Sequence, residues 1–382
     1  MQYGQIKEPT KFVTLNFKLD KAFNQENIST QLKEIESFYN DIDYCDNPKH
    51  SGWRKDNTFQ NLFRKEDDSI NVSIVSKEQL ENSLAEKENW DTNFISPNMF
   101  EKLDKYLIHL YPNTIDAFRG ERTNWNEMFV IPSMEVRASE IEDKFLIPYV
   151  KSPTELNTLG FDGKYENYLF VCDLPIAKLK ANYTGAYKWI QKFKNKKNTN
   201  GTRTIQETCE GHKPFWYSLR PKKANIVTAI NPFERFFFSF SENAFTIDQR
   251  LIAINVKSKN DVELIAALLN SIVTFLTVEM RGTSRNLGVL DLNANYFKTL
   301  RVLNPEMLTF QDKKQILNAF RILKKREIGT VFEEIKKTDR INFDKTVLKA
   351  FGISETILSS FYQILFISSL QQSNNERKMI VT

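Results

Sequence analysis

The sequence has 382 residues, of which 41% are hydrophobic, so it is long enough for two or three domains that each bury a core. Its longest apolar segment, residues 262–280, is interrupted by acidic and polar residues, which excludes a membrane span and predicts a buried helix. The three cysteines are far apart and the N-terminus lacks a secretory pattern, so we expect a reducing, cytoplasmic location.

The net charge of +5 is unevenly distributed along the sequence. Residues 178–223 contain twelve Lys and Arg against two acids, a local charge of +10, so the remaining residues together carry −5. A surface that binds a polyanion has this asymmetry, because each phosphate that it neutralises releases condensed counterion. The alternative interpretation is an ordinary solvated basic loop.

Residues 1–110 are predicted to form a mixed N-terminal segment. Apolar residues alternate at 11–17 and form a β-like run at 70–75, which predicts two strands. Apolar residues recur at helical spacing in 28–38, and residues 78–110 are expected to be largely helical. This segment carries little recognisable chemistry.

Residues 111–305 are predicted to form an irregular α+β module rather than a doubly wound sheet. One long central helix is expected from Asp261 to about Met280, because its apolar positions share one face and Asp261 suits the positive helix start. The expected strands lie at residues 128–131, 145–150, 168–172, 224–230, 235–240, 251–256 and 288–292.

Residues 306–382 are predicted to form a helical C-terminal cap. Residues 315–325 are amphipathic, and a helix at 343–351 is expected to stop at Gly352. Ser354 is a candidate N-cap for a final helix that runs to Leu365. The polar residues after 371 are expected to fray.

The most informative motif is the stretch FRGERTNWNEMFVI at residues 118–131. It resembles the opening of the C-terminal target recognition domain of adenine-specific DNA methyltransferases, in which a Gly precedes a Thr-Gly-x-Asn-like turn and a Phe-Val-Ile strand. Asn124 stands where that family has the second Gly, and Asn is the next best residue for a left-handed backbone. Further segments similar to the family follow in its order, at residues 147–153, 168–172, 186–190, 216–220, 268–271 and 288–292.

The resemblance implies sequence-specific recognition of double-stranded DNA, as the specificity part of an adenine-specific DNA methyltransferase or restriction-modification system. It also implies that residues 1–110 correspond to the end of a methyltransferase domain or a connector. The sequence lacks a glycine-rich cofactor turn and an Asn-Pro-Pro-aromatic motif, and Asn231-Pro232-Phe233 is only the nearest imitation. We therefore expect no catalytic, cofactor or metal residues in this sequence, and S-adenosylmethionine on a catalytic partner or missing domain.

Three loops rich in Arg, Lys and Asn are the candidates for the DNA-binding face, because these residue types read base edges and anchor phosphates. Arg281 and Arg285 have an alternative role at the C-terminal end of the preceding helix. The predicted DNA contacts are Arg119, Arg122, Asn124, Asn126, Lys188, Lys192, Lys194, Lys196, Lys197, Arg203, Arg281, Thr283, Ser284 and Arg285.

Two other functions remain open at the level of the sequence. A restriction endonuclease with a carboxylate metal site would use acid-x-Lys triplets such as those beginning at Glu142 and Glu334, although such triplets are common in a chain that is 26% charged. A protein-interaction module derived from the same fold is the second alternative. Cys209-x-x-His212 is at best half of a zinc site, because tetrahedral zinc needs four ligands.

Overall fold

The structure is a computed structural model. It describes residues 12–17, 33, 53–55, 62–65, 70–75, 81, 103–232, 235–281, 283–284, 290–359, 361–362 and 365. Apart from residue 33, which is helical, the helix expected at 28–38 lies outside these residues, as do most of the helix expected at 78–110 and the residues after 371.

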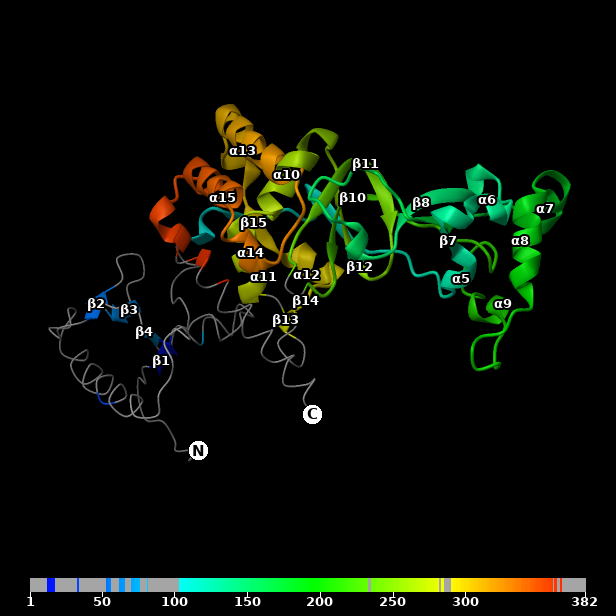
Figure 1. Cartoon of the computed structure of the whole chain (residues 1–382), viewed down its shortest axis with the longest axis horizontal. Helices are drawn as coiled ribbons and strands as arrows, with labels where there is room; N and C mark the ends of the chain where they lie inside the picture. The colour runs from blue at the N-terminus through cyan, green and yellow to red at the C-terminus, as the bar shows by residue number, and fades with distance from the viewer. Residues whose placement is uncertain are drawn as a thin grey trace.

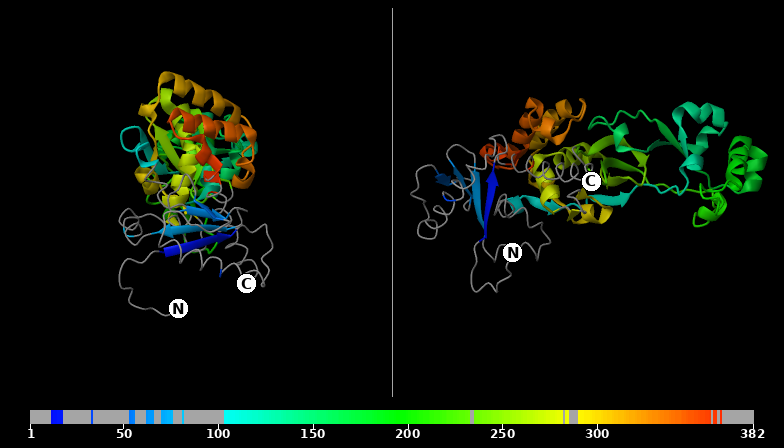
Figure 2. Two further views of the ribbon diagram at one scale, coloured as in Figure 1. Left: turned by 90° about the vertical axis from the view of Figure 1, so that its left-hand side faces the viewer. Right: turned by 60° about the horizontal axis from the view of Figure 1, so that its bottom comes forward.

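The N-terminal segment contributes a four-stranded antiparallel sheet in the order β1-β4-β3-β2. Both strands predicted there are confirmed, as β1 (Phe12–Phe17) and β4 (Ile70–Val75). The other two strands are β2 (Trp53–Lys55) and β3 (Leu62–Lys65). This sheet lies at one end of an elongated molecule (Figure 1, and Figure 2 from two further sides).

A seven-stranded mixed sheet forms the centre of the molecule, in the order β6-β12-β10-β11-β8-β9-β7. Neighbouring strands in it are antiparallel except β8 and β11, which run parallel through the pairs Tyr149–Thr246 and Val150–Ile247. The predicted α+β class is confirmed. The strands are β6 (Ile115–Arg119), β7 (Val130–Pro132), β8 (Leu146–Val150), β9 (Asn167–Phe170), β10 (Ala224–Ala229), β11 (Ser239–Ile247) and β12 (Leu251–Val256).

Two hydrophobic cores share this sheet, one on each side of the β8–β11 pair. We name the larger unit, residues 103–119, 150–161 and 224–365, the helical lobe. Residues 121–149 and 167–219 form the basic lobe. Figure 1 shows the two lobes side by side along the molecule, with the basic lobe farthest from the N-terminal sheet. The division at residues 110 and 305 that the sequence suggested stays a prediction.

Helices cover both lobes. In the basic lobe they are α5 (Asn126–Phe129), α6 (Val136–Ser139), α7 (Ile176–Asn182), α8 (Thr184–Lys194) and α9 (Ile205–Thr208). In the helical lobe they are α10 (Val262–Leu269), α11 (Ile272–Arg281), α12 (Ala294–Thr299), α13 (Phe310–Leu323), α14 (Val331–Glu334) and α15 (Thr338–Ala350).

The prediction of one long central helix is wrong, because α10 and α11 are separated by a break and bent by 66°. At the break, the Asn270 side chain accepts a hydrogen bond from the Phe238 N–H at 3.0 Å and donates one to the Phe238 carbonyl at 2.8 Å. The Asp344 carboxylate of α15 accepts from the Ile272 N–H at the start of α11. These partners satisfy backbone groups that the break leaves without a helical partner.

The bent pair is also the most apolar helical stretch among the described residues. No single helix there is long and apolar enough to cross a membrane, and α10 and α11 reach that composition only together. Their described side chains are nearly all buried inside the helical lobe, in agreement with the predicted buried segment.

Several other boundaries differ from the sequence predictions. The end of the expected 78–110 helix is a strand, β5 (Leu107–His109), because it pairs with β15 (Arg301–Leu303). In the 128–131 segment, α5 ends at Phe129 before β7 begins, and β11 begins only at Ser239. Of the strand expected at 288–292, the first two residues lie outside the described residues, and β14 (Leu290–Asp291) pairs with β13 (Thr283–Ser284). Ser354 caps a 3₁₀ turn at Glu355–Ile357, and the described residues that follow, 358–359, 361–362 and 365, are helical as predicted.

Candidate nucleic-acid interface

The chain crosses from the helical lobe to the basic lobe through the Arg119–Arg122 segment. The exposed Arg119 guanidinium donates from Nε to the Gln249 carbonyl at 2.6 Å. Gly120 packs against the backbone of the returning chain, where a Cβ atom would lie 2.1 Å from the Asp248 carbonyl oxygen. This close approach explains why the position is a glycine. Two residues later, the Arg122 side chain is exposed on the basic lobe.

The turn that follows presents two asparagines. Asn124 has φ +58°, so the left-handed backbone expected from the sequence is confirmed. The buried Thr123 hydroxyl donates to the Asn126 side-chain oxygen, which closes the turn in front of α5. The exposed Asn124 amide nitrogen lies 3.0 Å from Nε2 of His212.

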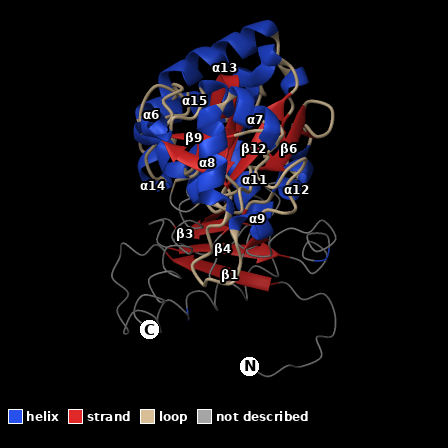
Figure 3. Ribbon diagram, turned by 90° about the vertical axis from the view of Figure 1, so that its right-hand side faces the viewer, coloured by secondary structure: helices blue, strands red, loops and turns tan. Residues whose placement is uncertain are grey.

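The lysine-rich segment lies on the outer face of α8 and the loop after it. Ala186, Ile190 and Phe193 bury the inner face of α8 in the core of the basic lobe. The loop is closed by an Asn198 turn and by a bridge between Lys197 and Thr204, which leads into α9. Figure 3 views this end of the molecule, with α7 and α8 in front of the sheet. The predicted cations are all exposed: Lys188, Lys192, Lys194, Lys196, Lys197 and Arg203.

Two of these lysines are paired with acids inside the basic lobe. Lys188 lies 3.2 Å from the Glu140 carboxylate, and Lys196 pairs with Glu127 of α5. The other four cations of the segment form no ion pair with any described residue; Lys192 lies 4.8 Å above the Trp189 ring. These four cations are available to phosphates without the loss of an internal ion pair.

The structure brings two of the three predicted loops together. The Lys196–Glu127 pair joins the loop after α8 to the first turn of α5, immediately after the asparagine turn. The third loop lies in the helical lobe, where Arg281 ends α11 and Thr283–Ser284 form β13. Figure 1 shows β13 and α9 on the same, lower side of the molecule. Arg285 lies outside the described residues.

The aromatic side chains near these loops belong to the core rather than to an exposed stacking surface. Tyr217 is buried and donates its hydroxyl to the Leu174 carbonyl at 2.8 Å. The Trp189 indole donates to the Met128 carbonyl at 3.0 Å, and Trp125 and Trp216 pack against the same hydrophobic cluster. Their positions therefore give these aromatic side chains a role in the core.

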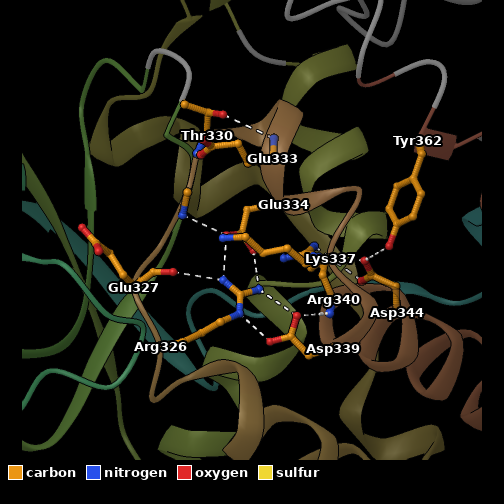
Figure 4. A network of polar contacts seen from close by, with 11 residues as sticks. Arg326, Glu327, Thr330, Glu333, Glu334, Lys337, Asp339, Arg340, Asp344 and Tyr362 are labelled. Carbon is orange, nitrogen blue, oxygen red and sulfur yellow. Dashed lines mark hydrogen bonds and ion pairs between the residues drawn. The ribbon is translucent and has the colours of Figure 1, made fainter.

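The carboxylates considered for a nuclease are engaged in structural contacts. The two oxygens of Glu142 accept from the Gly185 and Ala186 N–H groups at the start of α8, at 3.0 and 2.9 Å. Glu334 accepts from Arg326, Lys337 and the Gly329 N–H (Figure 4). These bonds outweigh burial, which alone would raise the pKa of Glu334, and hold it at about 2.

The possible half zinc site has the wrong surroundings for a metal. Burial raises the pKa of the Cys209 thiol to about 11, which disfavours the thiolate that zinc needs. His212 instead contacts Asn124 through Nε2, and its ring meets Phe129 edge to face with centroids 5.5 Å apart. Among the described residues, no three His, Cys, Asp or Glu side chains are grouped as metal ligands.

Comparison with known proteins identifies the fold. No protein-family model matches the sequence, and no curated protein matches it. The solved type IIG restriction endonuclease BpuSI superposes with a TM-score of 0.52 and 12% identity, over 80% of this chain and 36% of its own. The fold is that of part of a restriction-modification enzyme.

A second solved structure is the type IIL restriction-modification enzyme MmeI in complex with DNA. It aligns with a TM-score of 0.39 and 15% identity, over 68% of this chain and 36% of its own. The present chain thus spans about a third of the length of either enzyme. The relation to restriction-modification enzymes that the sequence suggested is confirmed for the fold, while the target recognition role and the contact residues stay predictions.

Proposed function

We propose that this chain recognises specific sequences of double-stranded DNA, as the specificity part of an adenine-specific DNA methyltransferase or restriction-modification system. The observation that carries the proposal is a group of exposed cations on α8 and the loop after it, beside an exposed asparagine turn. They form no ion pair with a described residue: Lys192, Lys194, Lys197 and Arg203. Cations anchor phosphates, and asparagine and arginine side chains read base edges.

The two DNA-binding loops of the basic lobe have separate roles in this proposal. The loop after α8 neutralises phosphates and releases counterions, which supplies affinity without sequence preference. The turn at residues 122–126 then approaches base edges in the major groove. S-adenosylmethionine and the methyl transfer to an extruded adenine would belong to a catalytic partner subunit or domain.

The proposal predicts that DNA binding depends steeply on salt and that the cations of α8 and the loop after it account for much of this dependence. Replacing Lys192, Lys194, Lys197 and Arg203 together by Gln should lower the slope of log K against log salt by about 3–4, because each phosphate contact contributes about 0.9. The measurement is fluorescence anisotropy with a mixed-sequence duplex between ~50 and ~200 mM salt.

A matched variant removes the same charge from the helical lobe. Lys314, Lys325, Lys336 and Lys345 are exposed there and form no ion pair with a described residue. Their replacement by Gln should leave the slope close to that of the unmodified chain. Equal slopes for the two quadruple variants would refute the assignment of the phosphate contacts, and salt-independent binding by the unmodified chain would refute the proposed function.

A further inference from the structure

The contact between Asn124 and His212 links two loops of the basic lobe that are 88 residues apart in the sequence. Asn124 lies in the turn before α5, and His212 follows α9. His212 is partly buried against Phe129, whereas Asn124 is exposed and held in the left-handed conformation. The anchored ring therefore supports an exposed amide.

With the ring proton of His212 on Nδ1, the pair sets which way the Asn124 amide faces. Burial lowers the pKa of His212, which keeps the imidazole neutral near pH 7. The unprotonated Nε2 can then accept a hydrogen bond from the Asn124 amide nitrogen. Asn124 keeps its second amide hydrogen and its oxygen, which accepts no hydrogen bond from a described residue.

An outward-facing donor and acceptor on one amide match the edge of adenine. In the major groove adenine offers N7 as an acceptor and N6–H as a donor, and asparagine pairs with both. A hydrogen bond to His212 through the other amide hydrogen is compatible with that pairing. It also removes the alternative orientation of the amide before DNA arrives, which lowers the cost of binding.

We propose that His212 is a positioning residue that orients the Asn124 amide to read an adenine base within the recognised DNA sequence. This inference rests on the proposed function and adds to it a specificity-determining pair. Asn126 is a poorer reader because its side-chain oxygen already accepts from Thr123 inside the turn. His212 itself acts only through Asn124.

Two substitutions at His212 separate positioning from packing. His212→Gln keeps a side-chain oxygen that can accept from Asn124, and His212→Phe keeps an aromatic ring against Phe129 without the acceptor. The recognised sequence is first selected from randomised duplexes with the full unmodified chain. Affinities are then measured for that duplex and for duplexes in which the adenine pair is replaced by each other pair.

We expect the unmodified chain and His212→Gln to prefer the adenine duplex by about five- to 150-fold, as one bidentate pair allows. His212→Phe should lose most of this preference while its binding to mixed-sequence DNA and its salt slope stay unchanged. Preference retained by His212→Phe, or lost equally by both variants, would overturn the positioning role.

A substitution at Asn124 tests the reading role without touching the partly buried ring. Asn124→Asp tolerates the left-handed backbone but offers only acceptors, so the preference at this position should shift from adenine toward cytosine, whose N4 amino group is a donor. Salt-dependent binding with an unshifted adenine preference would refute the inference and leave the proposed function standing. Absence of salt-dependent binding by the unmodified chain would refute both.

Discussion

Glu127 forms an ion pair with Lys196, one of the lysines of the basic lobe. Its carboxylate pairs with Lys196, and the hydrogen bond from this lysine lowers the pKa of Glu127. Both side chains are largely exposed, so the pair contributes little to stability. Its main effect is to neutralise one cation at the place where the two predicted DNA-binding loops meet.

We therefore predict that Glu127→Gln strengthens binding to mixed-sequence DNA. Release of Lys196 adds about one phosphate contact, which should raise the affinity about three- to tenfold at ~50 mM salt and steepen the salt slope by about 1. Glu306→Gln makes the same charge change at an exposed position of the helical lobe and should have little effect. An identical gain in both variants would attribute the effect to net charge alone.

Single residues differ in how far the sequence reveals their role. The left-handed conformation of Asn124 could be predicted, because a small polar residue stands where the resembling family has Gly. The contacts of Asn124 with His212 and of Glu127 with Lys196 could not, because they join residues 88 and 69 positions apart. The exposure of the lysines could be predicted from their charge. Which of them form ion pairs with acidic residues depends on the fold.

At the scale of elements, the break between α10 and α11 shows where a prediction from the spacing of apolar residues fails. Apolar spacing is consistent through residues 262–280 and predicts one helix. The break occurs because Asn270 bonds the backbone at Phe238 and Asp344 caps Ile272, and both partners are distant in sequence. The strand Leu251–Val256 was predicted with its observed bounds, because its continuous apolar run requires no distant partner to be recognised.

Glu334 connects α14 to the neighbouring segments through the ion network of Figure 4. It bonds Arg326, which also pairs with Asp339 of α15, and it bonds Lys337 between α14 and α15. Its pKa of about 2 in the folded state lies below its ordinary value. The carboxylate therefore stabilises the fold at pH values above about 4.3, and this contribution is lost as the pH falls toward 2.

We predict that Glu334→Gln lowers the free energy of unfolding by about 3 kcal/mol at pH 7 and has a smaller effect near pH 2. The measurement is urea unfolding of both proteins at several pH values between 2 and 7. Glu327→Gln, an exposed carboxylate in the same region, should follow the unmodified chain at every pH. A constant difference between Glu334→Gln and the unmodified chain across this range would contradict the assigned ionic role.

At the scale of the whole molecule, the two lobes meet at a joint built mostly from backbone. The Asp248 N–H donates to the Val150 carbonyl, and the Glu121 N–H donates to the Ile247 carbonyl. The buried Tyr149 hydroxyl donates to the Asp248 carboxylate at 2.8 Å. The sequence patterns predicted one module for these residues, because the division into two hydrophobic cores depends on contacts between residues that are distant in sequence.

Gly120 is the residue on which the closeness of this joint depends. A Cβ atom there would lie 2.1 Å from the Asp248 carbonyl oxygen and 2.6 Å from that of Ile247, and neither backbone group can move without displacing the β8–β11 pairing. Gly120→Ala should therefore lower the free energy of unfolding by on the order of 3 kcal/mol. Gly211→Ala provides the control, because no atom lies within 4 Å of a Cβ at that exposed position.

The two alanine variants are compared by urea unfolding and by hydrogen exchange of the Glu121 and Asp248 amides. We expect faster exchange at both amides in Gly120→Ala, because the added methyl group separates the strands that protect them. Gly211→Ala should match the unmodified chain in both measurements. If Gly120→Ala were as stable as Gly211→Ala and equally protected, the close packing of Gly120 against the Asp248 carbonyl would not be what holds the two lobes together at this joint.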